Sequence, residues 1–353
     1  MPLADRALVV GINQYPGISV LQGAENDAQD FHAWVTDQNG GGVDPANARL
    51  LVSSQFEASA VTDDAQPAKE QIEKFFIQVD NAAVANNNDN LGSKAGKRLW
   101  LFFSGHGFAP SLDKSAVLAA NATRRLIHNI AAMMWADRLY EGGWFDEVIL
   151  FQDACRAPIT FADLAPPFLL PRTAPSGQTR RRFYAFSAKN RKLSKELPLN
   201  GSVHGVFTAT LMEGLRGAAA DPKTGAVTTA QLKAYLQDNM QKLLPAADLL
   251  DDDVAKEPEV FDPDHFVVVD AKPGQAVAQF PVSIAIASSG APVRIEDGSL
   301  QTEQQQASAP ALWNLNLPRG LYRVVITDGP DATFKVTGAL LPDGTKAVTN
   351  VSL

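Results

Sequence analysis

The chain has 353 residues, of which 45% are hydrophobic and 20% charged, a composition typical of a folded protein with a substantial core. Its net charge of −8 argues against a nucleic-acid-binding surface, which needs a basic patch. No apolar run approaches the ~18 residues of a membrane-spanning helix, and the N-terminus lacks the basic region and cleavage site of a signal peptide. We therefore expect a cytoplasmic protein that binds neither nucleic acid nor membrane.

The first half of the chain alternates strand-like and helix-like segments. Short apolar runs rich in β-branched or aromatic residues predict buried strands within 6–13, 49–53, 97–107 and 146–156, and the strand in 97–107 runs into a glycine turn. Apolar residues at helical spacing predict helices between these strands, over 25–38, 68–79 and 128–141, with a polar loop at 86–96. This alternation predicts an α/β fold, a mostly parallel sheet with helices on both faces.

Residues 157–182 interrupt that alternation. The segment is rich in proline and arginine, which excludes a central strand or a regular helix and predicts a long exposed loop. A strand at 183–188 and helices at 205–217 and 228–244 follow, the last with a threonine cap. From about 276 only short alternating segments between Gly, Pro and Asp turns remain. We predict two domains, an α/β domain over 1–270 and a small immunoglobulin-like or regulatory-like β-sandwich over 276–353.

Cys155 is the only cysteine of the chain, which excludes an internal disulfide and cysteine-rich metal sites. A lone cysteine is commonly a small buried hydrophobic residue. Cys155, however, follows a predicted buried strand, and His106 follows another, within the turn Ser104-Gly105-His106-Gly107. Such positions meet at the carboxyl edge of a parallel sheet, and a thiol needs an imidazole or a positive dipole to become a good nucleophile. We expect Cys155 and His106 to act together; the alternative for His106 is a turn histidine that binds a local carbonyl.

The remaining titratable residues show no metal-ligand spacing. The other histidines lie on or beside predicted helices or near the domain junction; they are His32, His128, His204 and His265. We therefore expect no metal and no cofactor. The acidic run at 251–253 could bind an activating calcium ion, but a solvated linker is the simpler explanation.

Several motifs occur in an order that resembles the caspase-like clan of cysteine peptidases (peptidase C14), in particular the metacaspases and their bacterial relatives. The motifs are GINQY (11–15), GAENDA (23–28), SGHG (104–107), DACR (153–156) and GVFTATLMEGL (205–215). His106 precedes Cys155 by 49 residues, against about 50 in the caspase signature. The resemblance covers roughly residues 5–270 and implies a caspase-like sheet.

The resemblance also implies roles. Cys155 would attack the scissile carbonyl of a protein or peptide substrate, and His106 would carry the proton to the leaving amine. The backbone N–H groups of Gly107 and Cys155 would form the oxyanion hole. A bacterial effector in stress, cell death or anti-phage defence would fit such an enzyme. The alternatives are a non-catalytic scaffold, against which the intact Cys155 and His106 argue, and a switch gated by a ligand or partner at the β domain.

The metacaspase pattern implies an acidic pocket for P1, the substrate residue before the cut bond. Caspases place an aspartate-binding arginine after the first strand, where this chain has QYPG (14–17). The metacaspase acids correspond instead to Asp27 and Asp153. Two carboxylates would accept an arginine or lysine, so we expect cleavage after Arg or Lys. The alternatives are a helix N-terminal charge for Asp27 and a structural hydrogen bond for Asp153.

The arginine-rich loop suggests a zymogen. In caspases the segment after the nucleophile strand is cut during maturation. Here that segment carries Arg172, Arg180, Arg181 and Arg182, which an acidic pocket would accept. Self-cleavage within 157–182 and an uncut basic loop both remain open.

Overall fold

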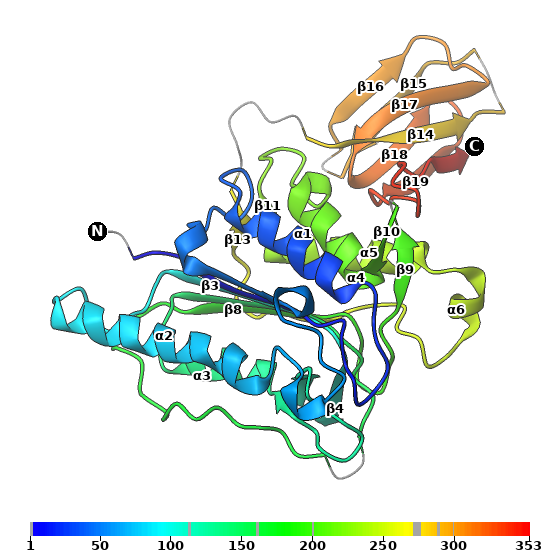
Figure 1. Cartoon of the computed structure of the whole chain (residues 1–353). Helices are drawn as coiled ribbons and strands as arrows, with labels where there is room; N and C mark the ends of the chain where they lie inside the picture. The colour runs from blue at the N-terminus through cyan, green and yellow to red at the C-terminus, as the bar shows by residue number, and fades with distance from the viewer. Residues whose placement is uncertain are drawn as a thin grey trace. The chain divides into compact units, whose positions relative to one another are not determined.

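The computed structural model describes residues 3–111, 114–159, 162–199, 201–270, 277–287, 290–298 and 300–353. Two compact units form (Figure 1). The first contains the residues up to Met212 and Leu244–Phe266, and the second contains Glu213–Leu243 and the residues from Val267 onward. These units differ from the predicted domains in the placement of 213–243 and of 267–270. The predicted junction, 271–275, lies outside the described residues, and the division into 1–270 and 276–353 stays a prediction.

The first unit is built on a six-stranded sheet in the order β12-β8-β7-β3-β1-β2. Its strands are β1 (Arg6–Gly11), β2 (Ala48–Val52), β3 (Arg98–Ser104), β7 (Glu147–Asp153), β8 (Arg181–Phe186) and β12 (Glu259–Phe261). All neighbours pair in parallel except β12, which is antiparallel to β8. The central strands are buried along nearly their whole length, as expected where both faces of a parallel sheet are covered. The predicted α/β class is confirmed.

Helices cover both faces of this sheet. On one face lie α1 (Ala24–Thr36) and α4 (Val206–Glu213), and on the other lie α2 (Lys69–Asn88) and α3 (Ala132–Glu141) (Figure 1). Because side chains alternate along a strand, β3 contributes to both layers. Phe102 stacks on Phe31 of α1 at 4.6 Å between ring centroids, whereas Phe103 joins the core on the side where Phe76 stacks on Trp135 at 3.9 Å.

Short elements near the carboxyl edge of the sheet were not predicted. After β3 the chain forms a small antiparallel sheet of β4 (Gly107–Ser111), β5 (Lys114–Leu118) and β6 (Asn129–Ile130). Before α4 it forms a hairpin of β9 (Glu196–Leu199) and β10 (Ser202–Gly205). These strands are too short and mixed in polarity to show a clear period. The first unit also contains α6 (Ala246–Leu250) and 3-10 turns at Pro45–Asn47, Ser53–Gln55 and Thr62–Asp64.

Helix α2 ends later than predicted. It continues to Asn88, into the expected loop at 86–96, because Val79 and Ala83 extend its buried stripe and packing outweighs the low helix propensity of asparagine. Helix α4 ends at Glu213, and a π-helical turn, Gly214–Ala218, carries the helical segment to one residue past the predicted end at 217. Gly217 has φ 115° there, a conformation that favours glycine.

The second unit combines α5 (Thr229–Asn239) with β strands. Thr228 caps α5 by accepting a hydrogen bond from Gln231 N, as predicted. One small sheet pairs β11 (Val227–Thr228) with β13 (Val267–Val269), and a 3-10 turn, Met240–Leu243, follows α5. A three-stranded sheet contains β14 (Gln279–Ala285), β17 (Leu312–Pro318) and β20 (Thr349–Ser352). A four-stranded sheet contains β15 (Val293–Asp297), β16 (Thr302–Gln306), β18 (Gly320–Ile326) and β19 (Asp331–Val336). The predicted C-terminal β strands are confirmed.

Helix α5 is bonded to these strands. Tyr235 Oη donates to Gly338 O at 3.0 Å, and Asn239 Nδ2 donates to Thr337 O at 2.8 Å. Arg319 pairs with Asp238 at 3.1 Å. These contacts explain why residues 213–243 group with the C-terminal strands. Among the described residues of both units, no helix is long and apolar enough to cross a membrane.

Candidate active site

His106 and Cys155 follow neighbouring strands of the central sheet. Ser104 at the end of β3 pairs with Asp153 at the end of β7, and Gly105 N donates to Asp153 O at 3.1 Å. His106 and Cys155 therefore leave the sheet at the same level. Both line one cavity of about 200 Å³, together with Asp27 and Asp153. The structure thus brings together four side chains that the sequence predicted to share a site.

A backbone carbonyl orients the imidazole of His106. Its Nε2 lies 2.8 Å from Ser19 O and 3.2 Å from Ser19 Oγ. A carbonyl oxygen only accepts hydrogen bonds, so Nε2 carries the proton and the neutral ring keeps Nδ1 as its basic nitrogen. Burial lowers the pKa of His106, opposed by the bond to Ser19 and the charge of Glu196. A neutral imidazole can serve as a general base at neutral pH.

Tyr15 supports the turn that carries His106. The Tyr15 hydroxyl accepts from His106 N at 3.1 Å and donates to Leu118 O at 3.4 Å. The phenol ring lies 4.8 Å from the imidazole, centroid to centroid. Gly105 has φ 158°, and a Cβ there would lie 2.5 Å from the Tyr15 hydroxyl, so the residue before His106 has room only for a hydrogen.

Replacing Tyr15 with phenylalanine should leave the N–H of His106 without a partner inside the protein. We expect a loss of about 1–3 kcal/mol in the free energy of unfolding, together with a lower kcat because the imidazole is held less firmly. Urea denaturation and steady-state kinetics measure the two effects. Tyr322→Phe is the matched control, since the hydroxyl of Tyr322 bonds Pro318 O in the C-terminal strands. An equal fall in kcat for both variants would contradict the role of Tyr15.

The thiol of Cys155 is neutral in the resting protein. Its Sγ lies 3.8 Å from Ser194 O. Burial raises the pKa of the Cys155 thiol and the charge of Asp153 adds to this, whereas the bond to Ser194 and the charge of Lys195 act in the opposite direction. Both shifts favour the uncharged forms of the two groups, the thiol of Cys155 and the neutral imidazole of His106.

If His106 is the general base, its pKa predicts the pH dependence of kcat/KM. The pKa of His106 in the free protein lies below its ordinary value of 6.5. For a peptide with an uncharged P1 residue we expect kcat/KM to be constant around neutral pH and to fall on the acid side with a midpoint below 6.5, because a protonated imidazole accepts no proton. Initial rates well below KM, measured across the pH range, test this; an acid midpoint above 6.5 would contradict it.

The turn after β3 passes directly against Ala154 and Cys155. A Cβ on Gly107 would lie 2.7 Å from Ala154 Cβ and 3.0 Å from Cys155 O. The backbones of residues 107 and 155 are therefore close neighbours, which an oxyanion hole built from both requires.

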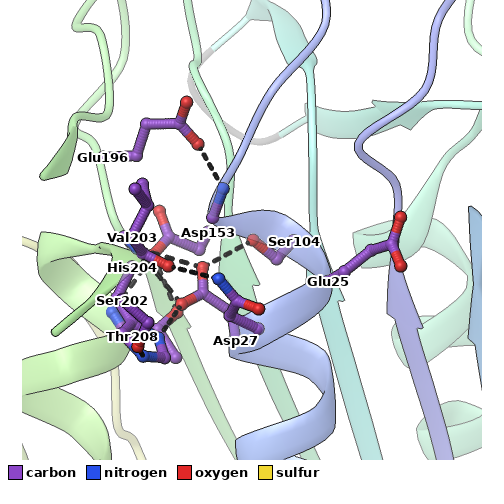
Figure 2. Close-up of polar contacts among 12 residues, drawn as sticks. Glu25, Asp27, Ser104, Asp153, Glu196, Ser202, Val203, His204 and Thr208 are labelled. Carbon is purple, nitrogen blue, oxygen red and sulfur yellow. Dashed lines mark hydrogen bonds and ion pairs between the residues drawn. The ribbon is translucent and has the colours of Figure 1, made fainter. Parts of the chain in front are cut away.

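Asp27 is buried at the start of α1, with 1% of its surface exposed. Its Oδ1 accepts from His204 Nδ1 at 3.0 Å and from Gly205 N at 3.1 Å, and its Oδ2 accepts from Ser104 Oγ at 2.9 Å (Figure 2). Burial raises the pKa of Asp27 to about 7, and the charge of Asp153 acts in the same direction, opposed by the bonds from His204 and Ser104.

Asp153 lies beside Asp27 and is also rich in hydrogen bonds. Its Oδ1 accepts from Ser194 Oγ at 2.6 Å, and its Oδ2 accepts from Thr208 Oγ1 at 2.7 Å. Burial raises the pKa of Asp153, and these bonds oppose the shift. A Cβ on Gly205 would lie 2.0 Å from Asp153 Oδ2 and 3.0 Å from Asp27 Oδ2. The two carboxylates therefore converge on Gly205 in the wall of the cavity.

The family model described as caspase domain matches residues 4–248. The chain belongs to the caspase domain family. The predicted caspase-like fold is thereby confirmed, and the family is one of cysteine peptidases that act on proteins or peptides. No curated protein matches the chain.

Among solved structures, the chain is similar to caspase-1 from Spodoptera frugiperda, with 13% identity and a TM-score of 0.48, covering 78% of this chain and 94% of that one. It is also similar to the structure of pro-sf-caspase-1, with 11% identity and a TM-score of 0.41, covering 74% of this chain and 91% of that one.

Several residues that line the cavity were not predicted. They lie between β8 and α4, in a segment whose sequence shows no periodicity. Ser194, Lys195 and Glu196 line the cavity. The Glu196 carboxylate accepts from Gly23 N at 2.8 Å, at the N-terminus of α1, where negative charge is favourable. His204 was expected at a helix start but belongs to β10. Only one feature of the sequence could have pointed to these four residues: they come just before the GVFTATLMEGL motif.

The arginines of the predicted cleavage loop make defined contacts. Arg172 donates to Gly142 O at 2.8 Å and lies over the ring of Trp144 at 3.7 Å. Arg180 donates to Tyr140 O at 2.8 Å. The expectation of a loop up to 182 was wrong at its end, because β8 begins at Arg181, where ion pairs hold the strand. Arg181 pairs with Glu147, and Arg182 pairs with Asp137 at 2.8 Å.

The acidic run at 251–253 packs against the loop that precedes β9. Asp253 O accepts from Leu193 N at 2.8 Å, and Asp251 Oδ1 accepts from Asp253 N at 2.9 Å. Within the described ranges no group of three or more His, Cys, Asp or Glu residues could hold a metal ion.

Proposed function

We propose that this caspase domain is a cysteine endopeptidase with Cys155 as nucleophile and His106 as general base. One observation carries the proposal: the two side chains line the same cavity from neighbouring strand ends, while Ser19 O holds Nε2 and leaves Nδ1 basic. A non-catalytic scaffold would not need that orientation.

In the proposed reaction the Cys155 proton moves to Nδ1 of His106, and the sulfur attacks the scissile carbonyl carbon. The N–H groups of Gly107 and Cys155 stabilise the resulting oxyanion. His106 then gives the proton to the leaving amine, and the C–N bond breaks to leave a thioester on Cys155. A water molecule gives up a proton to His106 and attacks the thioester, which releases the acid and restores the thiol.

We further propose cleavage after arginine or lysine. The support is the convergence of Asp27 and Asp153 in the cavity wall, since a carboxylate pair attracts a guanidinium or ammonium group. Matched fluorogenic peptides that differ only at P1 decide the matter, with arginine, lysine, aspartate and alanine compared by kcat/KM. The proposal expects arginine and lysine to lead, and a preference for aspartate would refute it.

Self-cleavage within 157–182 is expected after Arg172, not after Arg180, Arg181 or Arg182. A protease binds its substrate as an extended, locally unfolded segment, and β8, which pairs with β7, begins at Arg181. A cut after Arg180, Arg181 or Arg182 would need this strand to leave the sheet. Incubation of wild type beside Cys155→Ala, followed by mass spectrometry, locates any cut. Fragments beginning at residue 181, 182 or 183 would contradict the site assignment, and an intact wild-type band would remove self-processing.

We also propose a wider role for this endopeptidase. An effector of bacterial stress, cell death or anti-phage defence, kept as a cytoplasmic zymogen, agrees with an endopeptidase of this family. The alternative is a switch whose activity depends on a ligand or partner bound to the C-terminal strands. Activity of the purified full chain without added factors would favour the first, and activity only with added extract, fractionated to one component, would favour the second.

A further inference from the structure

His204 is a titratable side chain that the proposed reaction does not use. It belongs to β10, and 17% of its side chain is exposed. Its Nδ1 lies 3.0 Å from Asp27 Oδ1, and its Nε2 lies 2.8 Å from Ser202 Oγ (Figure 2). A carboxylate accepts and a hydroxyl can donate, so the neutral ring carries its proton on Nδ1 and donates it to Asp27.

The surroundings make this donor important to Asp27. The other titratable groups that line the cavity are His106, Asp153, Cys155, Lys195 and Glu196. Asp153 adds negative charge, and Lys195 pairs with Asp248 at 2.9 Å. Gly205 N and Ser104 Oγ are neutral donors to Asp27. His204 is thus a donor to Asp27 that can also become a cation.

We propose that His204 is a positioning residue for substrate specificity, which keeps Asp27 ionised and facing the P1 side chain by donating its Nδ1–H. The inference rests on the proposed cleavage after Arg or Lys. A buried carboxylate beside a second one takes up a proton readily when a donor is lost. Without His204, Asp27 becomes neutral at a higher pH, and the pocket loses its attraction for a cationic P1 group.

The electrostatics of Asp27 agree with this role. Burial raises the pKa of Asp27 to about 7, and the hydrogen bond from His204 is the largest influence that lowers it. A raised pKa means that Asp27 gains a proton as the pH falls through that value. Removing the imidazole donor moves this protonation of Asp27 to a higher pH.

Two peptide substrates separate the effect of the charge on Asp27 from the effect of the ionisation of Cys155 and His106. One peptide has arginine at P1, and the other has citrulline, in which an uncharged ureido group replaces the guanidinium. Cys155 and His106 act on both peptides, so their ionisation cancels in the ratio of the two kcat/KM values. The ratio is measured from about pH 5.5 to about pH 9 for wild type, His204→Leu and His204→Asn. Leucine fills the site without a donor, whereas the asparagine amide nitrogen takes the place of Nδ1.

For His204→Leu we expect the arginine-to-citrulline ratio to fall about tenfold at neutral pH and to recover at alkaline pH, where Asp27 ionises again. For His204→Asn we expect a midpoint close to that of wild type. A merely structural role predicts loss at all pH values without recovery, and that result, or an unchanged ratio in the leucine variant, would overturn the proposal. If His204→Leu does not fold, His204→Gln replaces it, because its amide nitrogen takes the place of Nε2 instead of Nδ1.

A binding measurement separates this inference from the proposed peptidase activity. Agmatine, a decarboxylated arginine, is titrated calorimetrically into the Cys155→Ala protein with and without His204→Leu, across the same pH range. We expect weaker binding in the double variant at neutral pH and recovery at alkaline pH. Equal binding by both proteins overturns the role of His204. Failure of wild type to cut arginyl or lysyl peptides refutes the proposed function instead.

Discussion

Cys155→Ala is expected to lower kcat/KM for peptide hydrolysis by about 10⁴-fold or more, and His106→Ala by a similar factor. In the proposed mechanism neither group works alone, because the thiol of Cys155, whose pKa is raised by burial, stays neutral until Nδ1 of His106 accepts its proton. Because the two residues act as one unit, the double variant should be no slower than either single variant. Initial rates on a P1-arginine peptide measure all three proteins.

The single cysteine of the chain provides an internal control for this prediction. Iodoacetamide can attach to one thiol only, so the extent of alkylation and the loss of activity should follow the same time course. The Cys155→Ala protein should take up no label and should keep the wild-type unfolding curve. Activity that survives complete alkylation would contradict the role of Cys155.

Asp27→Asn should reduce kcat/KM for P1-arginine peptides by about 10²- to 10³-fold, as removal of one partner of a buried charge pair costs about 3–5 kcal/mol. The citrulline peptide should lose much less, since its ureido group carries no charge. If Asp27 already binds the P1 guanidinium in the enzyme–substrate complex, the loss in kcat/KM should appear chiefly as a higher KM. Comparison of both peptides on purified protein gives the result.

Asp37→Asn is the matched control for this variant. Asp37 follows the last residue of the same helix and does not line the cavity. The Asp37→Asn substitution changes the net charge by the same amount as Asp27→Asn, but kcat/KM should remain close to that of wild type. Equal losses on both peptides in Asp27→Asn would show that the carboxylate supports the fold of the cavity, not the recognition of a positive charge.

The sequence was sufficient to predict the parallel strands of the sheet and the residues at its carboxyl edge, but not the antiparallel edge strand β12. Parallel strands buried on both faces show as continuous apolar runs, so Cys155 and His106 could be placed at strand ends on the same edge of the sheet. Asp27 and Asp153 came from the motifs that surround them. Their meeting in one cavity depends on the parallel pairing of β3 with β7 and on the packing of α1 against the sheet.

The supporting contacts could not be predicted, because they join residues that are distant in the chain and come from segments without periodicity. Ser19 reaches His106 through a backbone carbonyl, a group that every residue has. His204 lies in a hairpin of short strands, and Glu196 binds the start of α1 across the cavity. The sequence predicted an exposed basic loop up to residue 182. The ion pairs of Arg181 with Glu147 and of Arg182 with Asp137 could not be predicted, because the partners are distant in the chain.

Gly205 separates two functions of the proposed site, the reaction at Cys155 and the selection of the peptide. A Cβ on Gly205 would lie 2.0 Å from Asp153 Oδ2 and 3.0 Å from Asp27 Oδ2, so an alanine at this position would have to displace the carboxylates of the proposed pocket. Gly205 takes no part in the contacts that hold His106. We therefore expect a Gly205→Ala protein to react with small thiol reagents and to lose its preference for a long basic side chain. Reactivity toward small electrophiles and selection of a peptide would then be separable at a single backbone position.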